Sequence, residues 1–341
     1  MLWRVWRGSL ILTLGHLGLL LLMLLAGAVL GGDVIALSRD TLAAAPHLIL
    51  RDLQRGLDAQ IVYEGDFHSL PIWSPDGAWL AWLRGSSVAH WMLLRWDDLT
   101  VRPLAGSLPS GTMLAWSPDG QQVVFERTTA SGERRLMIAD VAGAEPRPLP
   151  NSPGLDQSAP SWSPDGRWVA YQMQAEDRIS RIVRYDLLAG RSETLPRDGA
   201  FYPTWSPAGD ALAYVVYSDR ERALGLYQLA DGRERVYPFD EPLDFSPPQW
   251  SPDGRYVAFG QGASQIWLLD TSTEALTRLT PPTRFQYAPR WSPDGRALLV
   301  TELGAAGQFS AVTLIALPTA EQRLLTSARI AANERMPTWR P

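Results

Sequence analysis

The sequence contains few of the residue types that usually carry out catalysis. It has no Cys, and its four His residues (His16, His47, His68 and His90) all lie in the first quarter of the chain. Without Cys, thiol nucleophiles and thiolate zinc sites are excluded. No Ser stands in a recognisable nucleophile elbow with a His base to activate it. The sequence therefore predicts no catalytic triad, no metal site and no cofactor.

Carboxylates are the remaining groups that could do chemistry. Glycoside hydrolysis uses two of them on either side of the scissile bond, and a ring of repeats could bring such a pair together. Five acidic residues precede a recurring Trp: Glu64, Asp66, Asp156, Asp244 and Glu334. Because loop carboxylates are most often simply solvated, we expect no catalytic residue among them. A sugar- or peptide-active enzyme remains an alternative.

The charge balance argues against nucleic acid as a partner. All 31 basic residues are Arg, and they face 36 acidic residues, which gives a formal net charge of −5. A protein that binds nucleic acid needs a basic surface. Two Arg–Glu–Arg triplets, at residues 220–222 and 233–235, are expected to be solvated turns with weak local ion pairs.

The first 32 residues have the composition of a membrane segment. Residues 9–32 carry no charge, and as a helix they would extend roughly 36 Å, enough to cross a hydrocarbon core of about 30 Å. Arg4 and Arg7 favour the cytoplasmic side. We therefore expect an N-terminal transmembrane helix that anchors residues 33–341 outside the cytoplasm, in the periplasm or at the cell surface. A signal peptide cleaved near residues 26–28 is the alternative.

One phrase of five residues recurs through the rest of the chain. Trp–Ser–Pro–Asp–Gly begins at Trp73, Trp116, Trp162, Trp250 and Trp291, a variant with Ala208 in place of Asp begins at Trp205, and a truncated copy begins at Trp339. A period near 40–45 residues, with short β-rich segments between Gly and Pro, is typical of β-propeller blades. In the turn, Pro fixes φ, Asp accepts backbone N–H bonds and Gly takes a positive φ. Ala208 is therefore expected to cost its turn a hydrogen bond.

Each repeat predicts four strands, which we name A to D in chain order. Strand A ends at the recurring Trp, and the turn leads into strand B. Pro stands two residues before the Trp in six of the seven copies: Pro71, Pro160, Pro203, Pro248, Pro289 and Pro337. Because Pro has no N–H to donate, it belongs on an edge strand. Strand A is therefore predicted to be the innermost strand of each blade, beside the central channel, with the Trp packed between neighbouring blades.

The two ends of the chain are predicted to share one blade. Upstream of the first full repeat, residues 34–37, 47–52 and 59–63 look like strands B, C and D, and residues 336–340 look like a lone strand A. Together they make a seventh blade and close the ring, which removes the open sheet edges. The predicted fold class is all-β, a seven-bladed β-propeller closed by its N- and C-terminal strands. Six blades with loose ends is the alternative.

The Pro–x–Trp–Ser–Pro–Asp–Gly phrase resembles the WD40-like (PD40) β-propeller repeat of TolB-type proteins. The same repeat occurs in the propellers of prolyl oligopeptidase and dipeptidyl peptidase relatives. The resemblance covers roughly residues 33–341 and implies the fold rather than an activity. The Gly–x–Ser–x–Gly elbow of the peptidase relatives does not occur in this sequence. What the resemblance implies is a scaffold of the TolB type.

The topology also predicts a binding face. Strand A begins at the D–A loop, so the seven D–A loops surround one mouth of the channel. Residues four and five before each Trp should line it, and the proposed ligand-binding residues are His68, Gln157, Phe201, Phe245, Gln286, Tyr287, Glu334 and Arg335. This mixture of aromatic, amide and charged groups suits a protein, peptide or glycan. We expect a non-enzymatic, membrane-anchored propeller that binds such a partner. A further alternative is an accessory subunit of a membrane protein complex.

Overall fold

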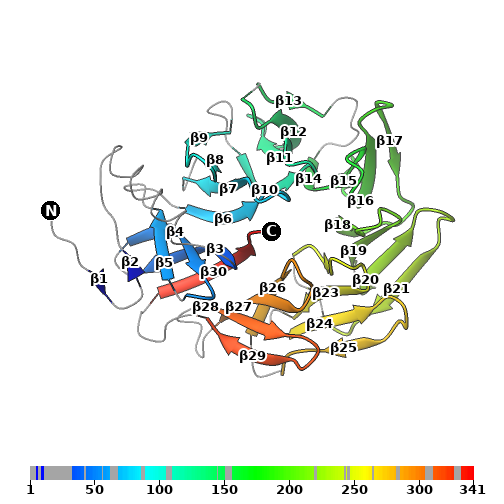
Figure 1. The fold of residues 1–341 in the computed structure, drawn as a ribbon. Helices are drawn as coiled ribbons and strands as arrows, with labels where there is room; N and C mark the ends of the chain where they lie inside the picture. The colour runs from blue at the N-terminus through cyan, green and yellow to red at the C-terminus, as the bar shows by residue number, and fades with distance from the viewer. Residues whose placement is uncertain are drawn as a thin grey trace.

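The computed structural model of the chain is built from β-strands. It describes residues 5–6, 9–10, 33–41, 44–55, 57–61, 68–85, 89–104, 110–143, 145–149, 156–218, 221–241, 243, 246–262, 265–281, 285–303, 310–325 and 332–341. Within these residues every regular element is a strand, and the strands form seven sheets arranged in a ring (Figure 1). The predicted all-β propeller of seven blades is therefore confirmed.

Six blades follow one another along the chain, each with four antiparallel strands in the order A–B–C–D. Blades 1 and 2 are β6 (His68–Trp73), β7 (Trp79–Arg84), β8 (His90–Arg95), β9 (Val101–Pro103) and β10 (Ser110–Trp116), β11 (Gln122–Thr128), β12 (Arg134–Asp140), β13 (Arg147–Pro148). Blades 3 and 4 are β14 (Asp156–Trp162), β15 (Trp168–Gln174), β16 (Ser180–Asp186), β17 (Arg191–Thr194) and β18 (Ala200–Trp205), β19 (Ala211–Tyr217), β20 (Arg222–Gln228), β21 (Glu234–Pro238). Blades 5 and 6 are β22 (Gln249–Trp250), β23 (Tyr256–Gln261), β24 (Gln265–Asp270), β25 (Leu276–Arg278) and β26 (Phe285–Trp291), β27 (Ala297–Leu303), β28 (Ser310–Ala316), β29 (Glu321–Leu324).

The seventh blade joins the two ends of the chain, as predicted. Its strand A is β30 (Ala332–Trp339), and strands B, C and D are β3 (Val34–Thr41), β4 (Ala44–Asp52) and β5 (Leu57–Ile61). Strand β30 pairs antiparallel with β3, and the register places Ala36 opposite Thr338. Figure 1 shows these strands, the blue β3 and the red β30, side by side.

The N-terminal segment adds two short strands to the outer side of this blade. Strand β1 (Val5–Trp6) pairs with β2 (Ser9–Leu10), and β2 pairs in parallel with β5. The transmembrane helix predicted over residues 9–32 therefore begins on two residues that the structure places in a strand, and its remainder, residues 11–32, lies outside the described residues. Among the described residues, no helix has the length and hydrophobicity needed to cross a membrane.

The hydrophobic core is divided among the junctions between blades. Seven clusters of buried apolar side chains each combine residues of two neighbouring blades, including one that joins blade 7 to blade 1. The recurring Trp contributes to these clusters, as Trp73, Trp116 and Trp205 illustrate with exposures of 5%, 7% and 8%. In blades 2, 4, 5 and 6 its indole also donates to a carbonyl of the preceding blade's strand A, at 2.9–3.3 Å. The predicted role of the Trp as a wedge between blades is confirmed.

Strand A has an irregularity that the repeat did not predict. It pairs only with strand B, which agrees with an innermost position. In blades 1, 3, 4 and 6 one extra residue interrupts its register three positions before the Trp, and that residue takes a φ of +51° to +55°: Leu70, Ala159, Tyr202 and Ala288. Each stands directly before the Pro. Such a bulge turns the side chains that precede it toward the other face of the sheet.

The turn between strands A and B is built in the same way in five blades. The Ser hydroxyl donates to the Asp Oδ1 atom at 2.5–2.6 Å, and the Gly takes a φ of +67° to +73°. In blade 4, where Ala208 replaces Asp, the Ser206 hydroxyl donates instead to Asp210 Oδ1 at 2.7 Å. The expectation that Ala208 leaves this turn short of a hydrogen bond is therefore wrong, because Asp210 supplies the missing carboxylate.

Replacing Asp210 by Ala should lower the free energy of unfolding by about 1 kcal/mol, since it removes the acceptor of a partly buried hydroxyl. Asp240→Ala is the matched control, because Asp240 is exposed and outside the turn; it should change stability by less than about 0.5 kcal/mol. Urea unfolding of the two variants measures the difference. Equal stabilities would show that Asp210 does not take the place of the motif Asp.

Candidate functional site

Three of the residues predicted to line the channel mouth are buried. His68 and Gln286 have no exposed surface, and Gln157 is 2% exposed. The bulge explains this, because it brings the fifth residue before the Trp onto the same face of the sheet as the Trp itself. In blade 1, for example, His68 lies opposite Arg84 and Trp73 opposite Leu80, four residues apart on β7. Side chains on this face pack against a neighbouring blade.

The contacts of these three residues are with neighbouring strands and blades. Trp82 Nε1 donates to His68 Nδ1 at 3.0 Å, and the Ser38 hydroxyl of blade 7 donates to the His68 carbonyl at 2.9 Å. Gln157 Oε1 accepts the Leu136 N–H of blade 2 at 3.1 Å. Gln286 donates to Glu302 Oε2 at 2.7 Å. These bonds join strands and blades, and the ligand-binding role of the three residues stays a prediction.

The other predicted residues have different positions. Phe201 and Tyr287, four residues before their Trp, are half-buried. Phe245 lies outside the described residues. Glu334 and Arg335 belong to β30, opposite Arg39 and Ser38, and their side chains are also outside the description. Phe201 belongs to the lining of a pocket.

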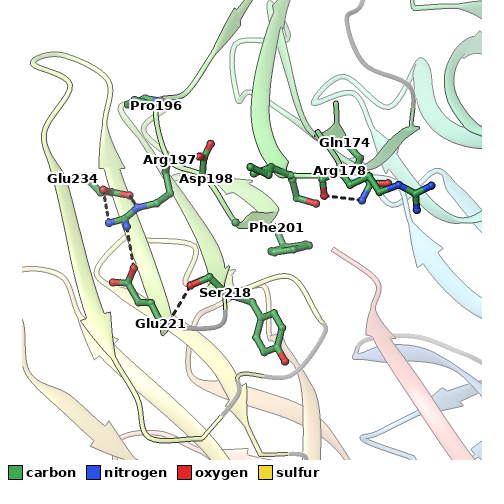
Figure 2. A pocket seen from close by; sticks show the side chains of 13 residues that line it. Gln174, Arg178, Pro196, Arg197, Asp198, Phe201, Ser218, Glu221 and Glu234 are labelled. Carbon is green, nitrogen blue, oxygen red and sulfur yellow. Dashed lines mark hydrogen bonds and ion pairs between the residues drawn. The ribbon is translucent and has the colours of Figure 1, made fainter. Parts of the chain in front are cut away.

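This pocket opens between blades 3 and 4 on the D–A face. It has a volume of about 860 Å³, which falls in the usual range for ligand sites. One wall comes from blade 3, at the β15–β16 loop and the loop that leads into β18. The other comes from blade 4, at the start of β18, the end of β19, the β19–β20 loop and the start of β21. Figure 2 shows the Phe201 ring between the Arg197 ion pairs and Arg178. The predicted face therefore carries an open pocket, and Phe201 is the one predicted residue among the described residues that line it.

The acidic side of the pocket is organised by Arg197. Its guanidinium, on the blade 3 side, pairs with Glu221 at 3.0 Å and Glu234 at 2.7 Å, both on blade 4. The pKa of Arg197 is raised above its ordinary value. The hydrogen bond with Glu234 is the largest cause, and the negative charges of Glu234 and Glu221 contribute less. Glu221 and Glu234 are the central residues of the two Arg–Glu–Arg triplets. The expected solvation holds for the exposed residues 233–235, but the ion pairs of Glu221 and Glu234 are not local, because each joins Arg197 on the neighbouring blade.

Tyr214 holds Glu234 in this arrangement through a hydrogen bond. Its hydroxyl donates to Glu234 Oε1, and burial, followed by this hydrogen bond, raises the pKa of the phenol well above its ordinary value. The ring reaches β21 by passing over Gly225, where a Cβ atom would lie 2.3 Å from it. Gly225 is therefore needed for the contact that orients Glu234. Neither Gly225 nor Arg197 carries a sequence signal, since both stand outside the recurring phrase.

The pocket also offers apolar surface and a cation. Phe201 lines it with Tyr217, which is 38% exposed, and with Ile179 and Pro196. Arg178 is exposed and forms no ion pair with the carboxylates of the described residues. Asp198 is paired with Arg181 at 2.6 Å. The three carboxylates that line the pocket among the described residues, Asp198, Glu221 and Glu234, are thus bonded to Arg, and none of them pairs with Arg178.

The described residues hold no group of His, Asp and Glu side chains that could bind a metal ion. Many solved structures match this fold, among them a TolB, a peptidase and a lyase. TolB from Acinetobacter baumannii is 16% identical, with a TM-score of 0.56 over 91% of this chain and 83% of that one. A puromycin-hydrolyzing peptidase from Mycobacterium tuberculosis is 18% identical, with a TM-score of 0.69 over 88% of this chain and 53% of that one. An oligogalacturonate lyase in complex with manganese is 16% identical, with a TM-score of 0.62 over 84% and 83%.

Identities this low show the fold alone. The three names describe proteins of different kinds, so the function of this chain has to be argued from its site. The family model is more specific. The model of the TolB β-propeller domain matches residues 45–237 and 196–303, which is more than half of the chain. The repeat, the seven sheets and this match together show that the chain belongs to the TolB β-propeller domain family.

Proposed function

We propose that this protein is a non-catalytic binding protein that takes an extended peptide segment of a protein partner into the pocket between blades 3 and 4. The observation that carries the proposal is the pocket, an open cavity of about 860 Å³ on the face formed by the D–A loops. In a closed propeller this face presents loops from every blade, which suits recognition by several short contacts.

The chemistry of the pocket favours a peptide with an apolar side chain next to an acidic one. Phe201 and Tyr217 offer aromatic surface, which is enriched in protein interfaces because it buries a large area with few rotatable bonds. Arg178 offers an exposed guanidinium that can bind a carboxylate through two parallel hydrogen bonds. Because Arg197 already holds Glu221 and Glu234, a basic peptide would have to break existing ion pairs to enter.

The same ion pairs support a binding role over catalysis. General acid catalysis by a carboxyl group requires its protonated form, which a neighbouring Arg disfavours. Among the described residues that line the pocket, the three carboxylates are bonded to Arg and none is a His. We also propose that the propeller functions outside the cytoplasm, attached to the membrane through the uncharged residues 11–32, because that run follows Arg4 and Arg7.

A photo-crosslinking amino acid placed at position 201 of the full-length protein in cells tests the proposed function. We expect one discrete polypeptide adduct at this position, and we expect Arg178→Glu to remove most of it. The matched control is position 188, because Leu188 is 85% exposed and lies in the turn between β16 and β17 on the opposite face. Identical adducts at both positions, or an adduct unaffected by Arg178→Glu, would contradict a partner in this pocket. A glycan adduct would contradict a peptide.

A further inference from the structure

A second candidate site lies inside the central channel, at its other end. The residue directly before each Trp belongs to, or directly adjoins, the innermost part of strand A: Ile72, Ala115, Ser161, Thr204, Gln249, Arg290 and Thr338. All seven are half-buried, although most of their Trp neighbours pack into the junctions. Because strand A has no partner on its inner side, we assign these side chains to the channel wall, close to the A–B turns.

Arg290 is the one charged residue in this ring. Its Nη1 atom donates to Gln249 Oε1 at 3.0 Å. Gln249 is itself held in place, since its Nε2 donates to the carbonyls of Pro247 and Pro248 at 3.0 and 3.1 Å and its own carbonyl accepts the Trp291 indole at 2.9 Å. The Gln249 amide therefore fixes the direction of the guanidinium.

No carboxylate of the described residues forms an ion pair with Arg290. Burial, the one cause acting on it, lowers the pKa of the guanidinium, which remains protonated all the same. The acids of the two adjacent A–B turns are occupied: Asp294 after Trp291 and Asp253 after Trp250 are exposed and accept bonds from their own turn Ser and backbone N–H. A guanidinium has five N–H donors, and Gln249 uses one of them.

A poorly hydrated cation without a counter-ion is costly inside a protein, and a bound anion removes much of that cost. We propose that Arg290, oriented by Gln249, forms an oxyanion site in the channel that takes a carboxylate or a phosphate. The planar fork of the guanidinium matches two oxygens of either group. The other five members of the ring besides Arg290 and Gln249 carry no charge: Ser161, Thr204 and Thr338 bear hydroxyls, and Ile72 and Ala115 are apolar and pack against blade junctions. This site does not depend on the function proposed for the pocket between blades 3 and 4.

Thermal unfolding of the full-length protein in detergent, with added anion at constant ionic strength, tests the site. The probes are sodium acetate, inorganic phosphate and a blocked triglutamate peptide; the first two represent a free anion and the third a carboxylate carried on a chain. We expect at least one of them to raise Tm saturably, by about 2–4 °C at ten times its dissociation constant. Saturation by acetate or phosphate indicates a free anion as the ligand, and saturation by the peptide alone indicates a carried carboxylate.

Arg290→Gln should abolish the saturable rise. Arg323→Gln, which removes the same charge from the exposed outer strand β29 of the same blade, should leave it unchanged. If Arg290→Gln does not fold, Arg290→Lys keeps the test decisive, because an ammonium lacks the guanidinium fork and should weaken binding several-fold. An equal rise in the parent and in Arg290→Gln, an unchanged affinity in Arg290→Lys, or no rise with any probe would overturn the proposal.

Discussion

A protein that lacks residues 332–341 is expected to lose the cooperative unfolding of the propeller. These residues include β30, and β3 has no other partner on its inner side. Four residues of β3, at positions 34–37, have no exposed surface, and the deletion would open that edge to water. Arg340 would be lost as well; it donates to the Gly77 carbonyl at 3.2 Å and covers the Trp96 ring at 4.6 Å.

The deletion therefore damages the junctions of blade 7 with both of its neighbours. Urea unfolding followed by Trp fluorescence should change from one sharp transition to a broad one at much lower denaturant. Removal of Pro341 alone is the control, because this residue is exposed and follows the strand. A cooperative transition at an unchanged midpoint after deletion of residues 332–341 would show that the ring does not depend on its last strand.

Asp58→Ala is expected to lower the free energy of unfolding by about 3–5 kcal/mol, the usual cost of removing one partner of a buried ion pair. The Asp58 carboxylate, 10% exposed, joins strands B, C and D of blade 7 through Arg39 at 2.7 Å and Arg51 at 2.7 Å. Arg51 also donates to the Leu325 carbonyl of blade 6 at 2.9 Å. Equilibrium unfolding measures the loss, and Asp240→Ala, an exposed Asp, is the matched control. A loss below about 1 kcal/mol would contradict a closing role for this cluster.

The same carboxylate should make the closing blade sensitive to acid. Burial alone raises the pKa of Asp58, but the hydrogen bonds and charges of Arg51 and then Arg39 outweigh it, so the pKa lies below its ordinary value. A lowered pKa in the folded state contributes stability that is present above the pKa of the unfolded chain, and this stability is lost as pH falls through the lowered value. The parent should therefore lose stability below about pH 4, and the Asp58→Ala variant should lose less over the same interval.

The repeat was sufficient to predict most of the fold. Trp, Ser, Pro, Asp and Gly each meet a local requirement of the turn or the blade junction. The spacing of this phrase therefore indicated seven blades, and it indicated that the two ends of the chain share one of them. Pro two residues before the Trp indicated the innermost strand. The bulge could not be read in the same way, because Leu70, Ala159, Tyr202 and Ala288 share no side-chain type that signals a positive φ. It changes which side chains face the neighbouring blade, and it buries His68, Gln157 and Gln286.

The sequence predicted the face of the propeller that carries the pocket, but not the pocket itself. Sequence topology placed the D–A loops around one mouth, and Phe201 was among the residues nominated there. The cavity itself depends on Arg197, Glu221 and Glu234, which come from three separate segments and meet only because blades 3 and 4 pack side by side. A contact of this kind, between residues outside the repeat, has no periodic signal. Asp210 is the converse case, since its position beside Gly209 could have revealed how the Ala208 turn is completed.

Closure of the ring by its two ends is tested most directly by joining them covalently. The chain has no Cys, so Ala36→Cys combined with Thr338→Cys introduces the two thiols alone, on directly opposed residues of β3 and β30. Opposed residues of antiparallel strands lie within the Cα separation that a disulfide requires. Mild oxidation of the folded protein should link the two positions, detected as a disulfide-joined peptide pair by mass spectrometry, and should stabilise the fold by about 2–4 kcal/mol. Two thiols that both remain open to alkylation after oxidation would contradict the closed seven-bladed ring.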